Sequence, residues 1–188
     1  MLYLISLLAL TALALLFIVV STYRLKAPPM PSSPDVREAL LKVTAKYTDN
    51  GGIADLGSGW GGLARKTSSI FSESRIYGVE GSLFPFLFSR VLEVFRKEKN
   101  ITFLYGNFFK PGFLKKLVKN TNVFFCYLSP LHMVRLKELF TIFEEYGSMH
   151  KYIISIVFAF PGLTPVEIVE VKDKLNSRIF VYKLNRYI

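Results

Sequence analysis

From Gly52 onward, short apolar runs alternate with segments in which apolar residues recur at helical spacing. Five such runs occupy residues 53–56, 76–79, 101–105, 123–128 and 152–158. Strands that alternate with helices build a mainly parallel sheet with helices on both faces. Two further strand-like runs, residues 166–171 and 179–184, follow each other without a helix between them. The sequence therefore predicts an α/β fold with a mostly parallel sheet and an antiparallel edge strand.

The N-terminal segment has a different character, because residues 2–20 carry no charge and only two polar side chains. At about 1.5 Å per helical residue, this run approximates the ~30 Å hydrocarbon thickness of a bilayer. A cleaved signal peptide is the alternative, but no basic residue precedes the run and no small-x-small cleavage site ends it. We therefore predict a transmembrane anchor at residues 1–23. Arg24 and Lys26 follow it, so the remaining chain is expected on the cytoplasmic side, or on the matrix side in an organelle.

A proline-rich spacer is predicted next, at residues 24–33, because proline favours extended backbone. Ser33 followed by Pro34 is typical of a helix N-cap and first helical position, and the helix is expected to run to about Tyr47. A chain of this length buries one substantial core. We therefore expect a single globular domain at residues 34–188.

The formal net charge of +10 falls on the part of the chain that follows the apolar run. Basic residues beside a membrane are attracted to anionic headgroups, at about 1 kcal/mol for each nearby Lys or Arg. Nucleic acid is another partner for such charge, but the sequence contains no recognisable nucleic-acid-binding motif. We therefore expect a membrane lipid bilayer as a partner and no nucleic acid.

The sequence Asp-Leu-Gly-Ser-Gly-Trp-Gly-Gly at residues 55–62 stands where the first strand gives way to the first helix of the alternating pattern. Glycines let the backbone turn tightly and approach a ligand, and the helix N-terminus offers free N–H groups. The spacing also satisfies the G-x-G-x-x-G pattern of dinucleotide-binding proteins. Asp55 favours a different ligand, because its carboxylate would repel a pyrophosphate but attract the ammonium group of S-adenosylmethionine.

Three residues after the next two strands extend this candidate site. Glu80 ends the second strand, where an acid can accept hydrogen bonds from both ribose hydroxyls of a nucleoside. After the third strand, Asn107 is a candidate to read the adenine edge and Phe108 to stack on its face. A turn residue followed by a core aromatic is the alternative for that pair. Together with the glycine loop, these residues predict a nucleoside-containing cofactor.

Over residues 32–184 the chain resembles class I methyltransferases, which have a Rossmann-like fold. The resemblance implies S-adenosylmethionine as the cofactor, held by Asp55, Gly57, Ser58, Gly59, Gly61, Glu80, Asn107 and Phe108. Within that class the layout is similar to the membrane-anchored lysine methyltransferase family, which includes the enzymes acting on ATP synthase subunit c and on the adenine nucleotide translocase. The similar features are an N-terminal hydrophobic helix, the Pro-rich stretch at residues 31–34, and Tyr-Leu-Ser-Pro at residues 127–130. This resemblance implies a protein-lysine N-methyltransferase that acts on a membrane-associated protein.

One departure from this family and one further resemblance keep other functions open. The lysine methyltransferase family usually has Gly-Asp-Gly-Arg where this chain has Gly-Trp-Gly-Gly at residues 59–62. The same loop, with the following Leu63 and Ala64, resembles the signature of cyclopropane fatty-acid synthases, which are considerably longer. A methyltransferase that acts on a lipid or quinone is therefore one alternative. A non-catalytic membrane scaffold with a methyltransferase fold is the other.

Few catalytic side chains are obligatory, since methyl transfer mainly needs positioning and a deprotonated nucleophile. Tyr127 is the candidate to orient an amine substrate or assist proton loss, and a place in the core is the alternative. His132 and His150 come without ligand-spaced cysteines or acids, so no metal site is expected. The single cysteine, Cys126, is expected to be a core residue in a reducing compartment.

Overall fold

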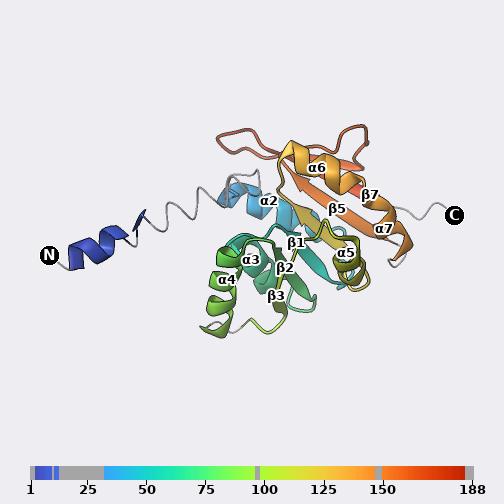
Figure 1. Cartoon of the computed structure of the whole chain (residues 1–188). Helices are drawn as coiled ribbons and strands as arrows, with labels where there is room; N and C mark the ends of the chain where they lie inside the picture. Colours follow the sequence, from blue (N-terminus) through green and yellow to red (C-terminus); the bar gives the residue numbers. More distant parts are fainter. Residues whose placement is uncertain (1–2, 10, 13–31, 96–97, 147–149, 185–188) are drawn as a thin grey trace. The chain divides into compact units, whose positions relative to one another are not determined.

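The computed structural model describes residues 3–9, 11–12, 32–95, 98–146 and 150–184 (Figure 1). The chain divides into two compact units, Met1–Pro31 and Ser32–Ile188. Residues 3–9 and 11–12 of the first unit are helical. No helix within the described ranges is long and apolar enough to cross a membrane. Residues 13–31, which hold the rest of the predicted anchor and most of the predicted spacer, lie outside those ranges, so both features stay predictions.

Seven strands of the second unit form one sheet. They are β1 (Ile53–Leu56), β2 (Ile76–Glu80), β3 (Ile101–Tyr105), β4 (Val123–Cys126), β5 (Lys151–Ile156), β6 (Glu167–Glu170) and β7 (Arg178–Leu184). Their order across the sheet is β3-β2-β1-β4-β5-β7-β6. The first five strands run parallel, whereas β7 is antiparallel to both β5 and β6. The predicted fold, a mostly parallel sheet with an antiparallel edge, is confirmed.

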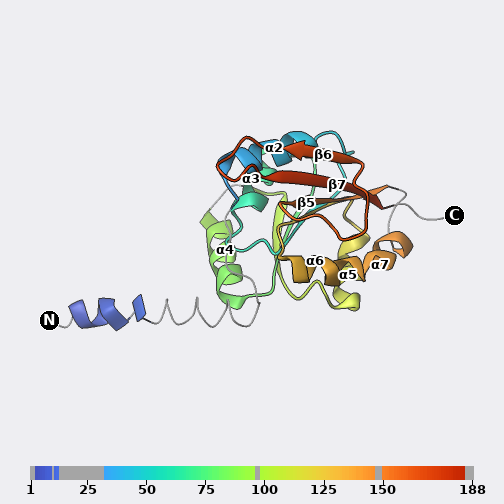
Figure 2. The ribbon, with the colours of Figure 1, turned by 90° about the horizontal axis from the view of Figure 1, so that it is seen from above.

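Helices cover both faces of this sheet (Figure 2). They are α2 (Pro34–Thr44), α3 (Gly62–Ile70), α4 (Leu83–Phe95), α5 (Pro111–Val118), α6 (Pro130–Lys137) and α7 (Phe140–Glu145). One core cluster joins α2 and α3 to one face of the sheet, and a second joins α5, α6 and α7 to the other. The central strands β1, β4 and β5 are buried on both faces, which explains why they are nearly continuous apolar runs in the sequence.

The start of α2 follows from its capping residues. The backbone N–H of Val36 donates to Ser33 Oγ (3.2 Å), and Pro34 occupies the first helical position. Apolar residues at intervals of three and four then turn one side of the helix toward the sheet. The helix ends at Thr44, three residues before the predicted end, since the next residues form a turn.

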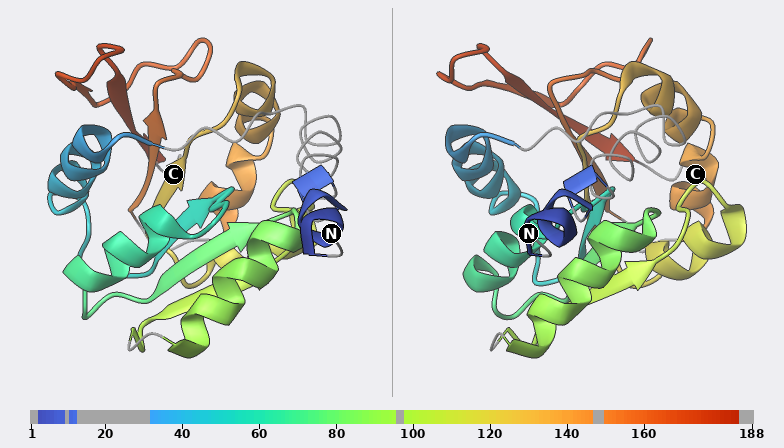
Figure 3. Two further views of the ribbon diagram at one scale, coloured as in Figure 1. Left: turned by 90° about the vertical axis from the view of Figure 1, so that its left-hand side faces the viewer. Right: turned by 60° about the vertical axis from the view of Figure 1, so that its left-hand side comes forward.

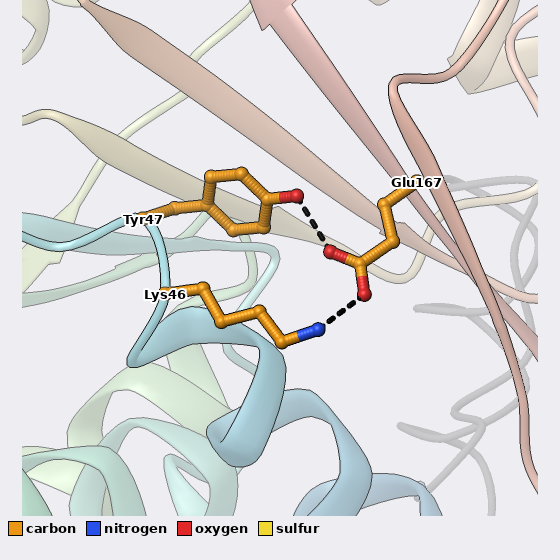
Figure 4. Close-up of polar contacts among 3 residues, drawn as sticks. All are labelled: Lys46, Tyr47 and Glu167. Carbon is orange, nitrogen blue, oxygen red and sulfur yellow. Dashed lines mark hydrogen bonds and ion pairs between the residues drawn. The ribbon is translucent and has the colours of Figure 1, made fainter.

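The chain just after α2 is tied to the antiparallel edge by one acidic residue. Glu167 on β6 accepts a hydrogen bond from the Tyr47 hydroxyl and forms an ion pair with Lys46, both at 2.5 Å (Figure 4). Burial, and then the neighbouring Glu167 carboxylate, raise the pKa of Tyr47 to about 12. Its hydroxyl therefore keeps its proton, and the hydrogen bond, throughout the physiological range.

Two strands end earlier than their apolar runs. β4 stops at Cys126 instead of residue 128, because the chain there turns toward the α6 N-terminus. β5 stops at Ile156, because Val157 adopts a left-handed backbone conformation with φ of 71°. A β-branched residue rarely adopts that conformation. Both strand ends lie at the carboxyl edge of the parallel sheet, where open α/β sheets bind their ligands.

Candidate functional site

The glycine loop between β1 and α3 forms a turn that only glycine accommodates easily. Gly57, Gly59 and Gly61 have φ of 85°, 53° and 77°. The backbone N–H groups of Gly57 and Ser58 both donate to the carbonyl of Val79 on β2 (2.9 Å each), which fixes the loop across the strand ends. A Cβ on Gly59 would meet no atom within 4 Å. The loop therefore leaves open space beside Gly59 at the carboxyl edge of the sheet.

Asp55 points to the same face of the sheet as α2, and it is only 5% exposed. Burial, and then the charge of Glu80, raise the pKa of its carboxyl to about 7, while the charge of Arg37 opposes that rise. Within the ranges that the structure describes, no hydrogen bond or ion pair joins the Asp55 carboxylate to another residue. A buried carboxylate costs free energy unless it is protonated or paired. Asp55 is thus suited to a cationic ligand group that would pair with it.

Glu80 ends β2 as predicted, but its carboxylate already has partners in the protein. Its two oxygens accept hydrogen bonds from the backbone N–H of Gly59 (2.8 Å) and of Ser82 (2.7 Å). Glu80 thereby holds the glycine loop against the turn that follows β2. A carboxylate offers about four lone-pair sites, so two remain for ribose hydroxyls. The predicted ribose contact stays a prediction, and positioning the loop is a second role that the sequence did not reveal.

The remaining predicted cofactor residues differ in how they face the site. Ser58 Oγ is buried and has no hydrogen-bond partner in the described part of the chain. Asn107 is exposed, and its side-chain oxygen accepts from the backbone N–H of Phe109 (2.9 Å), which makes a local turn. Phe108 is buried in the core cluster with α5 and α6, whereas Phe109 is partly exposed. The structure therefore places Phe108 mainly in the core, which was the alternative for that residue.

Tyr127, directly after β4, packs partly buried on the α2 face of the sheet. Burial, and then the charge of Asp173, raise the pKa of its hydroxyl above the usual range. The hydroxyl consequently keeps its proton at neutral pH and is suited to orient a group rather than to remove a proton.

A second group of side chains gathers on the other side of the β4 end. Ser129 Oγ and His132 Nδ1 are joined by a hydrogen bond of 2.9 Å. The His132 ring stacks on Phe109 with 5.4 Å between ring centroids, and Arg135 lies over the same phenyl ring at 4.5 Å. Burial, and then the charge of Arg135, lower the pKa of His132. The imidazole is therefore neutral at pH 7 and able to accept a proton.

The cysteine and the second histidine of the sequence lie in surroundings that do not suit catalysis or metal binding. Burial raises the pKa of the Cys126 thiol to about 12, which keeps it protonated and unreactive. His150 is exposed. Among the described residues, no three or more His, Cys, Asp or Glu side chains gather as a metal site would require.

Several solved structures with the same architecture are described as methyltransferases. An RNA methyltransferase from Salinibacter ruber, in complex with S-adenosyl-L-homocysteine, matches with a TM-score of 0.69 and 19% identity, covering 85% of this chain and 96% of that one. Precorrin-6y C5,15-methyltransferase from Geobacter metallireducens matches with a TM-score of 0.61 and 16% identity, covering 85% and 92%. A SAM dependent methyltransferase from Aquifex aeolicus has a TM-score of 0.61 and 13% identity, covering 82% and 94%.

These similarities define the class of fold. The chain has the Rossmann-like fold of S-adenosylmethionine-dependent methyltransferases, as the sequence predicted. Comparison with family models and with curated proteins gave no match. At identities below one fifth, the solved structures establish the fold and leave the substrate open.

Proposed function

We propose that this chain is an S-adenosylmethionine-dependent methyltransferase whose cofactor lies at the carboxyl ends of β1 and β2. The observation that carries the proposal is the buried Asp55 carboxylate, which has no hydrogen-bond or ion-pair partner among the described residues and lies beside a loop with open space at Gly59. The ammonium group of the cofactor would neutralise that carboxylate. A dinucleotide would instead bring a pyrophosphate toward it, at an electrostatic cost.

Other atoms of the loop also suit this ligand. Ser58 Oγ, which has no hydrogen-bond partner among the described residues, is available to a polar ligand atom, and the Glu80 carboxylate retains acceptor capacity for ribose hydroxyls. S-adenosylmethionine would supply an electrophilic methyl group on a sulfonium centre. The contribution of this chain is then to hold the ligand by Asp55, the glycine loop and Glu80, and to bring an acceptor to the end of β4.

We further propose a lysine amine on a membrane-associated protein as the acceptor. An amine attacks only in its neutral form, so a proton acceptor near the β4 end would assist. His132 is suited to that role, because its lowered pKa keeps the ring neutral. In the tautomer whose Nδ1–H donates to Ser129 Oγ, the Nε2 atom is left to accept a proton from the substrate. Tyr127 would orient the amine from the other side of the strand end. The predicted anchor, if formed by residues 1–23, would hold the site near the bilayer.

The acceptor is tested by incubating membranes from a deletion strain with the purified full chain and methyl-labelled S-adenosylmethionine, then separating protein, lipid and RNA. Label recovered as methyl-lysine after acid hydrolysis of a protein band is the expected result. Label confined to the lipid extract would replace the lysine acceptor with a lipid or quinone. Label confined to RNA would match the substrate named for the Salinibacter ruber enzyme. Cofactor binding without any transfer would favour the scaffold.

A further inference from the structure

The surface of α4 is unusually apolar for a helix at the outside of a domain. Leu87, Phe88, Val91, Val94 and Phe95 of this helix are all exposed, the last two by 82% and 80%, and Ser89 is its only fully buried residue. Trp60 of the glycine loop is 44% exposed and packs edge to face on Phe88, with 5.0 Å between ring centroids. We call these six apolar residues the α4 face. Contiguous exposed apolar surface of this kind marks a contact with a protein or a membrane.

The helix lies near the β3 edge of the sheet, against which it packs on one side (Figure 3). Its apolar positions recur at intervals of three and four residues, so they share one side of the helix. Phe86 packs against the core cluster instead, which fixes the opposite side to the domain. The apolar side of α4 is thus turned outward.

Charge distinguishes a membrane from a protein partner for this face. The only charged residues of α4, Arg90 and Glu93, form an ion pair with each other at 2.7 Å. No net charge on the helix therefore opposes its burial in an apolar phase. The sequence after the helix, Arg-Lys-Glu-Lys at residues 96–99, holds three basic residues and one acidic residue, and the whole chain carries a net charge of +10. An apolar helix face with tryptophan and phenylalanine, on a chain of net positive charge, is typical of a helix that lies in the interface of an anionic bilayer.

We propose that the α4 face rests in the headgroup and outer acyl region of an anionic lipid bilayer. This contact goes beyond the proposed function, since it assigns a surface and needs no methyl transfer. It has a consequence for the site, because Trp60 belongs both to the α4 face and to the glycine loop. A bilayer seated on this face brings the loop and the turn after Glu80 close to the membrane surface. An acceptor at that surface then needs no long reach to meet the site.

Trp60 reports on this contact directly, because it is the only tryptophan in the chain. The full chain is reconstituted with vesicles of phosphatidylcholine and phosphatidylglycerol, whose acyl chains are either unmodified or brominated. Bromine quenches tryptophan only on close approach. We expect emission at shorter wavelength than in buffer, and about twofold or greater quenching by the brominated lipid, as for an aromatic residue buried ~5–10 Å into the interface.

Two double variants test whether lipid contact depends on the α4 face or on exposed apolar residues anywhere on the domain. Val91→Glu with Phe95→Glu should abolish most of the quenching, because two acids then face the lipid. Ile168→Glu with Leu175→Glu removes two apolar residues of comparable exposure on the antiparallel edge and in the loop after it, at the same change of charge, and should leave quenching as in the wild type. Thermal unfolding monitored by circular dichroism verifies that each variant folds.

The unmodified chain alone suffices to overturn the proposal. Equal Trp60 emission in brominated and unmodified vesicles, with the protein floating with the vesicles, would show that the α4 face does not meet lipid. Emission that shifts with protein concentration but not with lipid would assign the face to a second copy of the chain. Emission already shifted in the absence of lipid, and insensitive to bromine, would assign it to another segment of the same chain. Methyl transfer and cofactor binding are measured separately, so their failure leaves this result readable.

Discussion

Replacing Asp55 by asparagine should stabilise the ligand-free protein in a pH-dependent way. The carboxyl is buried, and its pKa is raised from 3.8 to about 7, chiefly by burial. At about 1.36 kcal/mol per pKa unit, this rise corresponds to about 4 kcal/mol. Asparagine keeps the shape of the side chain and stays neutral, so it removes the cost of burying a charge. It would also weaken cofactor binding, because the ammonium group of the cofactor would lose its carboxylate partner.

The sign of the pH dependence follows from which state binds the proton more tightly. Because the folded-state pKa of Asp55 lies above the unfolded-state value, its contribution to stability is fully present below about pH 4 and is lost as the pH rises through about 7. The asparagine variant has no such loss. We therefore expect it to exceed the wild type in unfolding free energy by about 2 kcal/mol at pH 5 and by about 4 kcal/mol at pH 8.

Urea unfolding of the ligand-free chain at the two pH values measures this difference. Glu73→Gln, which removes an exposed acid, is the matched control and should show no change between them. A wild type as stable as Asp55→Asn at pH 8, or a difference that does not grow with pH, would refute the reasoning that Asp55 is buried without a partner.

Three further predictions concern the loop, the core and the β4 end. Gly61→Ala should destabilise the folded protein by about 2 kcal/mol or more in thermal unfolding, because Gly61 has φ of 77° and an added Cβ would lie 2.6 Å from the Phe103 ring. The control Gly112→Ala, which has open space around it, should stabilise the folded protein by about 0.5 kcal/mol. Lys151→Met should lower the urea unfolding free energy by about 2 kcal/mol, because its buried Nζ donates to two backbone carbonyls, at 2.7 and 2.5 Å, and the methionine cannot replace these hydrogen bonds. His132→Gln should lower kcat about 100-fold and leave cofactor affinity unchanged. The control His150→Gln, at an exposed position, should alter neither quantity. Equal kcat for both variants would exclude His132 as the proton acceptor.

Much of the architecture follows from local patterns in the sequence. A strand buried on both faces leaves an apolar run, so β1 was predicted with its observed bounds. The edge strand β3 was also predicted with its observed bounds, although its residues are alternately buried and exposed. The strand ends were harder, because the ends of β4 and β5 depend on backbone turns, such as the left-handed Val157, that apolar composition does not encode. The end of α2 was likewise set three residues too late.

The site was predictable where backbone geometry limits the residue type, and less so where tertiary contacts decide. Gly57, Gly59 and Asp55 follow from the loop and the strand end. The hydrogen bonds that Glu80 makes to the loop, and the pairing of Ser129 with His132, join residues whose contacts become visible only in three dimensions. A serine three residues before a histidine at a proline-initiated helix was the available signal for that pair. The exposed side of α4 could not be inferred from an apolar sequence that is equally typical of a buried helix.

The most direct test of the proposed function is a calorimetric titration of the full chain with S-adenosylmethionine at pH 8, beside NAD and beside the Asp55→Asn variant. We expect S-adenosylmethionine to bind and NAD not to bind. We expect Asp55→Asn to bind S-adenosylmethionine about 10- to 100-fold more weakly, which corresponds to the loss of one charge-assisted hydrogen bond. Binding of NAD in preference, or no heat and no thermal shift at millimolar S-adenosylmethionine, would contradict the assignment of this site to the methyl donor.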